Sequence, residues 1–354
     1  DFAKPIRSNS IPHSISEEHR QALLGTTFAN SYGSQFIVLL HRFLMDYFRD
    51  PTKFIQGLAI RSVIGIVLGV TWFGQAGNTQ ETIFPTQGAL FACCMNGVMD
   101  TVMQTALLVP NIKALLLREY RNGFYALLPL QLALTACNGL AQTMNIMALA
   151  FPVYFMVGLQ PSVEHFLIFL SALTLLVWLG VSVGIAVGAN ASSFQDAQAA
   201  VVPLLVPLIL FSGYLIPYAQ IPWYFKWLYE ISFFQHAIAI LEINQFEGIH
   251  FSDCPPIFDD DSPNLLNNHT CAELGTLLED AMSDDSTTFA NHSAAFVDEC
   301  FSSYTLCYTT GTELLKSLHV FPSDLALDFY IILIYIAGIL LLGYGLLCRV
   351  ASKY

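Results

Sequence analysis

Few side chains in this sequence have the potential for chemistry, because charged residues make up only 12 % of the chain and hydrophobic residues make up 55 %. One of them is Asp100, a carboxylate in the middle of a long apolar run, with Asn96 and Gln104 one helical turn away on the same face. A carboxylate near the centre of a membrane helix costs about 2.5–3.5 kcal/mol and is therefore a functional candidate. Asp100 could contact a polar or cationic ligand or take up a proton, or it could be protonated and bonded to Asn138 or Gln142.

A second set of polar side chains forms a stripe along the apolar run 126–157. Its members recur at steps of four and three residues, which places them on one helical face: Gln131, Thr135, Asn138, Gln142 and Asn145. Lipid would penalise such a stripe, so we expect it to face other helices or a wet cavity. Hydrogen bonds between helices alone would explain it equally well.

A third set lies in the segment KALLLREYRNGFYALLP, residues 113–129. It carries Lys113, Arg118 and Arg121 beside Glu119, although the whole chain has only 14 Lys and Arg residues. A cluster this dense between two apolar runs must be held in water. The simplest explanation is a solvated turn at the cytosolic face of a membrane.

The sequence shows no pattern for enzymatic chemistry. No stretch reads GxxxxGK[ST], the phosphate-binding loop of many ATP-binding proteins, and no Ser/His/Asp, Cys/His or metal-ligand spacing occurs. We therefore expect no catalytic site, no metal site and no nucleic-acid partner within these residues. The chain begins with Asp rather than Met, so we expect it to be a piece of a longer protein.

Membrane helices must position these side chains. A crossing needs about 20 mostly apolar residues, and the absence of strict two-residue alternation favours helices over barrel strands. The sequence predicts an all-α membrane protein with six transmembrane helices, at 54–74, 84–109, 126–157, 165–189, 197–217 and 327–348. In the fourth of these, Gly180, Gly184 and Gly188 recur every four residues and should let a neighbouring helix approach closely.

The distribution of Lys and Arg predicts the orientation, since these residues accumulate on the cytosolic side. With the N-terminus inside, only Lys226 and Lys316 fall outside, provided that Arg61 extends its side chain toward the cytosolic face. The segment 113–121 is then the cytosolic bend between the second and third spans.

Residues 247–328 are predicted to form a large, acidic external loop, which accounts for the net charge of -13. The loop suits an oxidising compartment, because it holds four cysteines and two glycosylation acceptors: Cys254, Cys271, Cys300, Cys307, Asn268 and Asn291. The cysteines could form two disulfides in any of three pairings, or they could be free thiols. A further acceptor sequence at Asn190 falls on the cytosolic side, and we expect it to stay unmodified.

Two further segments are predicted to lie in the membrane surface without crossing it. Residues 34–50 carry apolar side chains on one side and charged ones on the other, which predicts an interfacial helix ended by Pro51. A core helix of a missing soluble domain would show the same pattern. Residues 221–246 are aromatic but hold four titratable side chains, which favours helices that dip into the outer leaflet: Lys226, Glu230, His236 and Glu242.

Five short motifs, taken in order, resemble the membrane domain of a G-type (white and pleiotropic-drug-resistance) ABC transporter over roughly residues 34–349. They are RDP at 49–51, Arg61 early in the first span, REYRNGFY at 118–125, FSGYLIP at 211–217 and IPWYFKWLYEISFFQHAIAILEINQFEG at 221–248. The resemblance implies the ABC-2 (G-type exporter) architecture. It also implies a nucleotide-binding domain that precedes this unit and holds ATP and Mg²⁺, and a second membrane unit, identical or different.

The resemblance divides the chain into five parts. They are a linker at 1–30, an amphipathic connecting helix at 31–53, transmembrane helices 1 to 5 at 54–217, re-entrant helices and an external loop at 218–326, and the sixth transmembrane helix with a cytosolic tail at 327–354.

The resemblance also assigns roles to residues. Coupling to the nucleotide-binding domain falls to the bend and the connecting helix, where Arg42 or Arg49 would pair with Glu119: Lys113, Arg118, Glu119, Tyr120, Arg121, Arg42 and Arg49. The substrate cavity falls to the second and fifth spans: Asn96, Gly97, Asp100, Met103, Val206 and Ile209. An apolar plug above the cavity falls to Tyr214 and Leu215.

The function expected from this resemblance is ATP-driven export of a lipid, sterol or hydrophobic xenobiotic, from the plasma membrane, by a dimer. Two other hypotheses fit the residues. One is an ATP-independent carrier or channel that uses Asp100 and the polar stripe as an ion path. The other is a non-transporting receptor whose acidic external loop binds ligands.

Overall fold

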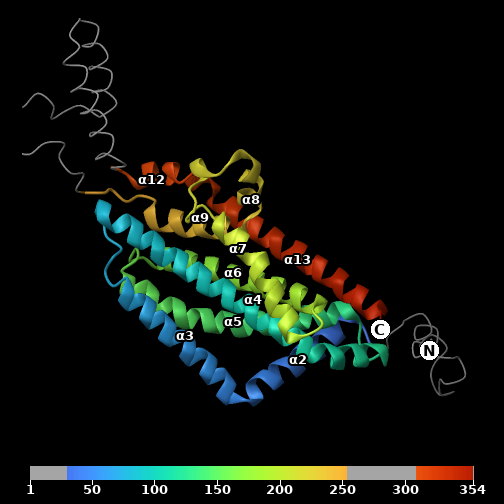
Figure 1. Ribbon diagram of the computed structural model, residues 1–354. Helices are drawn as coiled ribbons and strands as arrows, with labels where there is room; N and C mark the ends of the chain where they lie inside the picture. Colours follow the sequence, from blue (N-terminus) through green and yellow to red (C-terminus); the bar gives the residue numbers. More distant parts are fainter. Residues whose placement is uncertain (1–29, 253–307, 354) are drawn as a thin grey trace, which may run out of the picture.

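The computed structural model describes residues 30–252 and 308–353, which are almost entirely helical (Figure 1). The long helices are α2 (Tyr32–Arg49), α3 (Pro51–Thr71), α4 (Ile83–Arg121), α5 (Leu127–Val157), α6 (Val163–Asn190), α7 (Phe194–Leu210) and α13 (Leu325–Lys353). The short ones are α8 (Lys226–Ile231), α9 (Phe233–Phe246) and α12 (Gly311–Ser317). Among the described residues, α3, α4, α5, α6 and α13 are long and apolar enough to cross a membrane, and α7 is a shorter apolar helix. The predicted all-α membrane fold is confirmed.

Helix α6 is the centre of the bundle, and α4, α5 and α13 pack around it. Its contact with α4 depends on glycine. A Cβ atom on Gly184 would lie 2.6 Å from Cβ of Thr105 and 2.9 Å from the carbonyl oxygen of Val102, and one on Gly188 would lie 2.7 Å from Cβ of Val109. The predicted close approach of a neighbouring helix is therefore confirmed, and the neighbour is α4.

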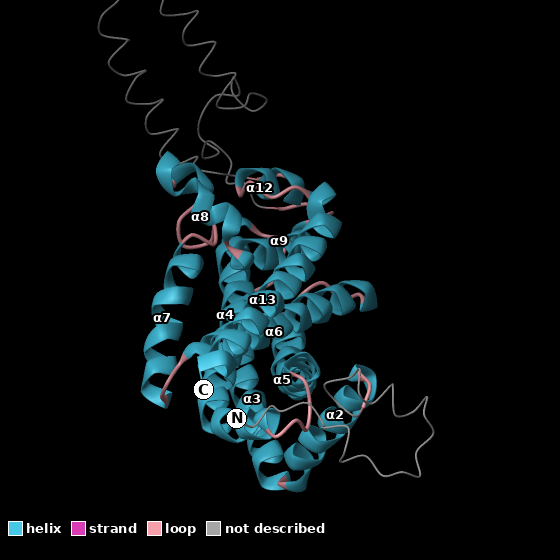
Figure 2. Cartoon of the chain, turned by 90° about the vertical axis from the view of Figure 1, so that its right-hand side faces the viewer, coloured by secondary structure: helices cyan, strands magenta, loops and turns pink. Residues whose placement is uncertain are grey.

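Helices α2 and α3 form a V at the end of the bundle where the chain's C-terminus lies (Figure 1). Helix α2 ends at Arg49, just before Pro51, as the sequence predicts, and α3 begins at Pro51 itself. Helix α3, the left arm of the V, packs closely on α5, since a Cβ atom on Gly65 would lie 2.7 Å from the carbonyl oxygen of Leu149. Figure 2 shows α7 at one edge of the bundle, and α2 lies toward the opposite edge.

Two predicted boundaries are corrected. Helix α4 does not end at residue 109 but runs unbroken to Arg121, so the charged segment forms its last turns rather than a separate bend. The turn itself follows at 122–126, where Gly123 has a φ of 77°. Helix α7 ends at Leu210 rather than 217, and the backbone cannot continue as an α-helix through Gly213, which adopts a φ of 93°.

Helix α9 does not cross the membrane but is buried against α13, α6 and α4. Buried polar contacts hold it there. Nδ1 of His236 lies 2.7 Å from Oδ1 of Asp328 on α13, and Nε2 of Gln87 on α4 donates to Oε1 of Glu242 at 3.1 Å. The sequence predicts that this segment does not span the membrane, and it is not among the candidate spans of the described residues.

Some predicted features lie outside the described residues. These are the linker up to residue 29, the four cysteines of the external loop and the glycosylation acceptors Asn268 and Asn291.

Candidate functional site

The end of α4 is joined to α2 by a partly exposed ion pair between Arg42 and Glu119. Nη1 of Arg42 donates to Oε2 of Glu119 at 2.8 Å, and Nη2 of Arg42 donates to Oε1 at 3.1 Å. Such a two-bond arginine–carboxylate contact fixes geometry as well as charge. The predicted pairing with Glu119 is therefore present, and Arg42 makes it; Arg49 lies exposed in the last turn of α2.

Tyr125, in the turn between α4 and α5, completes this contact. Its hydroxyl donates to Oε2 of Glu119 at 2.9 Å. The hydrogen bond with Glu119 raises the pKa of Arg42 above its ordinary value, and burial followed by the same carboxylate raises the pKa of Tyr125. Arg42, Glu119 and Tyr125 thus join α2, the end of α4 and the start of α5, and we call them the α2–α4 clamp.

A second contact joins α2 to the turn. The buried side chain of Gln35 accepts from the backbone N–H of Ala126 at 2.8 Å, and Leu39 is buried beside Leu116 and Leu127. Sequence reasoning missed Gln35 and Tyr125. A glutamine on the apolar face of an amphipathic helix is the one signal that could have indicated the first.

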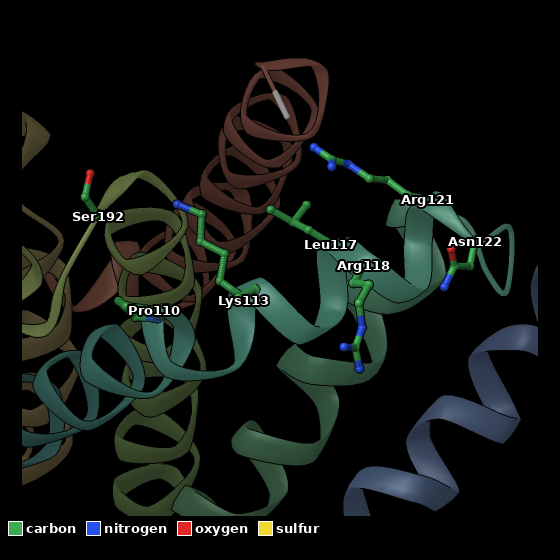
Figure 3. Close-up of a pocket in the computed structure, with 8 residues that line it drawn as sticks. Pro110, Lys113, Leu117, Arg118, Arg121, Asn122 and Ser192 are labelled. Carbon is green, nitrogen blue, oxygen red and sulfur yellow. The ribbon is translucent and has the colours of Figure 1, made fainter. Parts of the chain in front are cut away.

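The basic side chains of α4 line a pocket of about 530 Å³ beside the connection between α6 and α7 (Figure 3). Nζ of Lys113 donates to the carbonyl oxygens of Ala189 and Ala191 at 2.7 and 3.0 Å, so it caps the C-terminal end of α6. Arg118 and Arg121 lie one and two turns further along, with Arg121 on the same side of α4 as Lys113. Tyr120 packs against the apolar cluster beneath α2.

Asp100 forms an ion pair across the bundle. Its Oδ2 accepts from Nη2 of Arg61 on α3, whose Nη1 also donates to the carbonyl oxygen of Asn96 at 3.1 Å. The side chain of Arg61 is 6 % exposed and that of Asp100 is 42 % exposed. The expectation that Arg61 extends toward the cytosolic face is wrong, because a buried guanidinium needs a counter-charge and Asp100 provides it.

A chain of hydrogen bonds continues from Asp100 into the polar stripe of α5. Nδ2 of Asn145 donates to Oε1 of Gln142 at 3.2 Å, Nε2 of Gln142 donates to Oε1 of Gln104 at 2.8 Å, and Nε2 of Gln104 donates to Oδ2 of Asp100. Direct bonding of a protonated Asp100 to Asn138 or Gln142 is therefore wrong. Asn138 instead donates to Leu134 of its own helix, and Gln104 stands between Asp100 and Gln142.

The remaining predicted cavity residues differ in exposure. Val206 is exposed, Asn96 and Met103 are half-buried, and Gly97 and Ile209 are buried. A Cβ atom on Gly97 would lie 3.5 Å from Ile146 of α5, so this position faces the chain's own helix. The structure thus brings Asn96 and Asp100 together around Arg61 and places Gly97 behind them.

Of the two predicted plug residues, Tyr214 packs against α4 and Leu215 does not. The ring of Tyr214 stacks on Phe91 of α4 at 4.4 Å between centroids and on Phe84 at 6.2 Å, whereas Leu215 is exposed. The hydroxyl of Tyr214 would lie 3.2 Å from a Cβ atom on Gly88. Tyr214 therefore packs directly against α4.

Comparisons with known proteins find a matching family model and several relatives of this chain. A family model described as "ABC-2 type transporter" matches residues 34–246. The chain is 25 % identical over 329 residues to "ABC transporter G family member 24" of Dictyostelium discoideum, covering 92 % of this chain and 24 % of that protein. It is 24 % identical over 323 residues to "Protein white" of Drosophila melanogaster, covering 90 % and 40 %. It is 26 % identical over 248 residues to the "Broad substrate specificity ATP-binding cassette transporter ABCG2" of Bos taurus, covering 70 % and 36 %. The chain thus spans 24–40 % of the length of these three relatives.

Proposed function

Because the chain belongs to the family of ABC-2 type transporter membrane domains, with relatives among the G family and the white proteins, we propose that it is the membrane unit of an ATP-driven exporter. The chain is a multi-pass integral membrane protein domain. The proposed cargo is a lipid, a sterol or a hydrophobic xenobiotic, and the proposed location is the plasma membrane.

The observation that carries the proposal is the α2–α4 clamp. Helix α4 has 39 residues and runs without a break from one side of the bundle to the clamp. Arg42, Glu119 and Tyr125 tie its end to a helix that lies across the bundle. A force applied to this end therefore reaches the whole of α4 and, through Tyr214, the plug.

The force would come from a nucleotide-binding domain, in the same polypeptide or in a partner, that holds ATP and Mg²⁺. The basic side chains of Lys113, Arg118 and Arg121 offer it a charged docking surface at the end of α4. A second membrane unit, identical or related, would complete the transport path. Binding of ATP would then move α4 and Tyr214 and let the cargo pass to the outside.

Vanadate-sensitive ATP hydrolysis by the full-length protein in lipid tests this proposal, with sterols and amphipathic drugs screened as stimulators. We expect Arg42→Glu and Glu119→Arg each to reduce stimulation by cargo about tenfold or more, because each leaves two like charges facing each other across the clamp. The double variant Arg42→Glu/Glu119→Arg should recover much of the stimulation. Glu164→Lys, a charge reversal at an exposed position in the first turn of α6 and away from the clamp, is the matched control.

Two results would contradict the proposal. One is a full-length protein, alone or with its partners, that hydrolyses no ATP in the presence of any tested cargo. The other is a double variant that is no better than either single variant, since the clamp would then play no part in coupling.

A further inference from the structure

The Arg61–Asp100 pair lies at the depth of the bundle's centre. Arg61 is the central residue of the 21-residue helix α3, and Gln142, at the other end of the hydrogen-bond chain, is the central residue of the 31-residue helix α5. Two helices thus independently place Asp100 far from either membrane surface.

Every donor around Asp100 points toward its carboxylate. Arg61 donates from α3 and Gln104 from the next turn of α4, and Gln142 and Asn145 donate in sequence toward Gln104. A carboxylate that accepts from a guanidinium and an amide is stabilised in its charged form. Asp100 therefore accepts hydrogen bonds from two helices at one point of the bundle.

One oxygen of this carboxylate has unused capacity. Both hydrogen bonds to Asp100 end on Oδ2, and within residues 30–252 and 308–353 no donor lies on Oδ1. The side chain is also 42 % exposed on the surface of this chain. A carboxylate oxygen at this depth is too costly to face lipid, so it faces a wet path, a bound molecule or the second membrane unit.

We infer that Oδ1 of Asp100 accepts a hydrogen bond from a neutral hydroxyl group on an otherwise apolar cargo, and that Arg61 sets this preference. Arg61 and Asp100 together carry no net charge, so a permanently cationic group would meet the guanidinium as well as the carboxylate. An anion would meet the exposed oxygen and be repelled. A neutral O–H donor satisfies Oδ1 with neither conflict.

This inference rests on the proposal that cargo passes along α4, and it deepens that proposal. In this inference Asp100 binds the hydroxyl group of the cargo. Arg61 holds the carboxylate of Asp100 in place and balances its charge. Asn96, whose carbonyl oxygen also binds Arg61, holds the guanidinium from the same side.

The test uses three photoactivatable probes with one hydrocarbon chain: a long-chain alcohol, its O-methyl ether and its trimethylammonium analogue. Each is crosslinked to the full-length protein in lipid without nucleotide, and the yield on peptides of α4 is measured by mass spectrometry. We expect the unaltered protein to capture the alcohol about tenfold more than the ether, as for a hydrogen bond to a charged acceptor. The alcohol should also exceed the ammonium probe.

The double variant Arg61→Met/Asp100→Leu removes both charges together and should capture alcohol and ether equally. Ser171→Ala is the matched control, because Ser171 is an exposed spanning residue that bonds only to its own helix. Equal capture of alcohol and ether by the unaltered protein would overturn the inference, and so would a preference that survives the double substitution. Preferential capture of the ammonium probe would replace the hydroxyl with a cation and also overturn it.

These outcomes separate the inference from the proposed function. A protein that prefers the alcohol but hydrolyses no ATP contradicts only the exporter proposal. A protein that exports cargo with ATP but does not discriminate between alcohol and ether contradicts only the inferred hydrogen bond between Asp100 and a hydroxyl group.

Discussion

At the scale of single residues, three carboxylates within the described part of the bundle each have a partner on another helix. Asp100 faces Arg61, His236 faces Asp328 and Glu242 faces Gln87. Glu242 differs from the others, because its partner is an uncharged amide that cannot offset the cost of burying a carboxylate.

The stability of the protein should therefore depend on pH through Glu242. Burial raises the pKa of Glu242 to about 8, although the hydrogen bond from Gln87 opposes this shift. Between the ordinary value of 4.5 and about 8, the folded chain keeps a proton that the unfolded chain has released, so the free energy of unfolding falls as the pH rises through this window. Thermal unfolding in detergent at pH 5 to 9 measures it.

We expect Glu242→Gln to flatten this dependence, because glutamine cannot ionise, and to raise the unfolding temperature at pH 9 by a few degrees. Glu230→Gln, at an exposed position nearby, is the matched control and should leave the slope unchanged. An equal slope in the wild type and Glu242→Gln would show that Glu242 ionises normally in the folded chain.

At the scale of elements, the α4–α6 contact is a close helix pairing that depends on glycine. We expect Gly184→Ala to destabilise the protein by about 1–3 kcal/mol, because its new methyl group would overlap Thr105 and the Val102 carbonyl and force the helices apart. The unfolding temperature in detergent measures this effect. Gly338→Ala on α13 meets no atom within 4 Å and should have no effect or a slightly stabilising one. If both variants lower the unfolding temperature by similar amounts, the packing of Gly184 against α4 does not explain the effect.

The elements were largely predictable from the sequence, but their partners were not. Apolar length and Lys/Arg placement predict the spans, and four-residue glycine spacing predicts a close contact. Neither can say that the partner of Gly184 is α4. The Arg61–Asp100 pair was missed for the same reason. The spacing of polar residues along a helix shows which face each of them occupies. It does not show which two faces come into contact, because that depends on how the helices cross. The boundary at residue 109 failed because charge density marks where water begins, and α4 continues into water as a helix.

At the scale of the whole molecule, the predicted orientation has a direct chemical test. The large loop outside the described residues should carry sugar on Asn268 and Asn291, whereas Asn190, at the end of α6 beside Lys113, should carry none. Enzymatic deglycosylation of the full-length protein from a eukaryotic host should shift its electrophoretic mobility. Asn268→Gln and Asn291→Gln should each remove one step of that shift, and Asn190→Gln should remove none. A shift lost with Asn190→Gln alone would invert the topology.

The length of α4 has a mechanical consequence. Its 39 residues span about 58 Å, nearly twice the roughly 30 Å thickness of the hydrocarbon core. If such a rod pivots near its outer end by about 5°, its inner tip sweeps about 5 Å. A small angular change at the outer end of α4 therefore corresponds to a displacement of several ångströms at Glu119, so the two ends of the helix move by unequal distances.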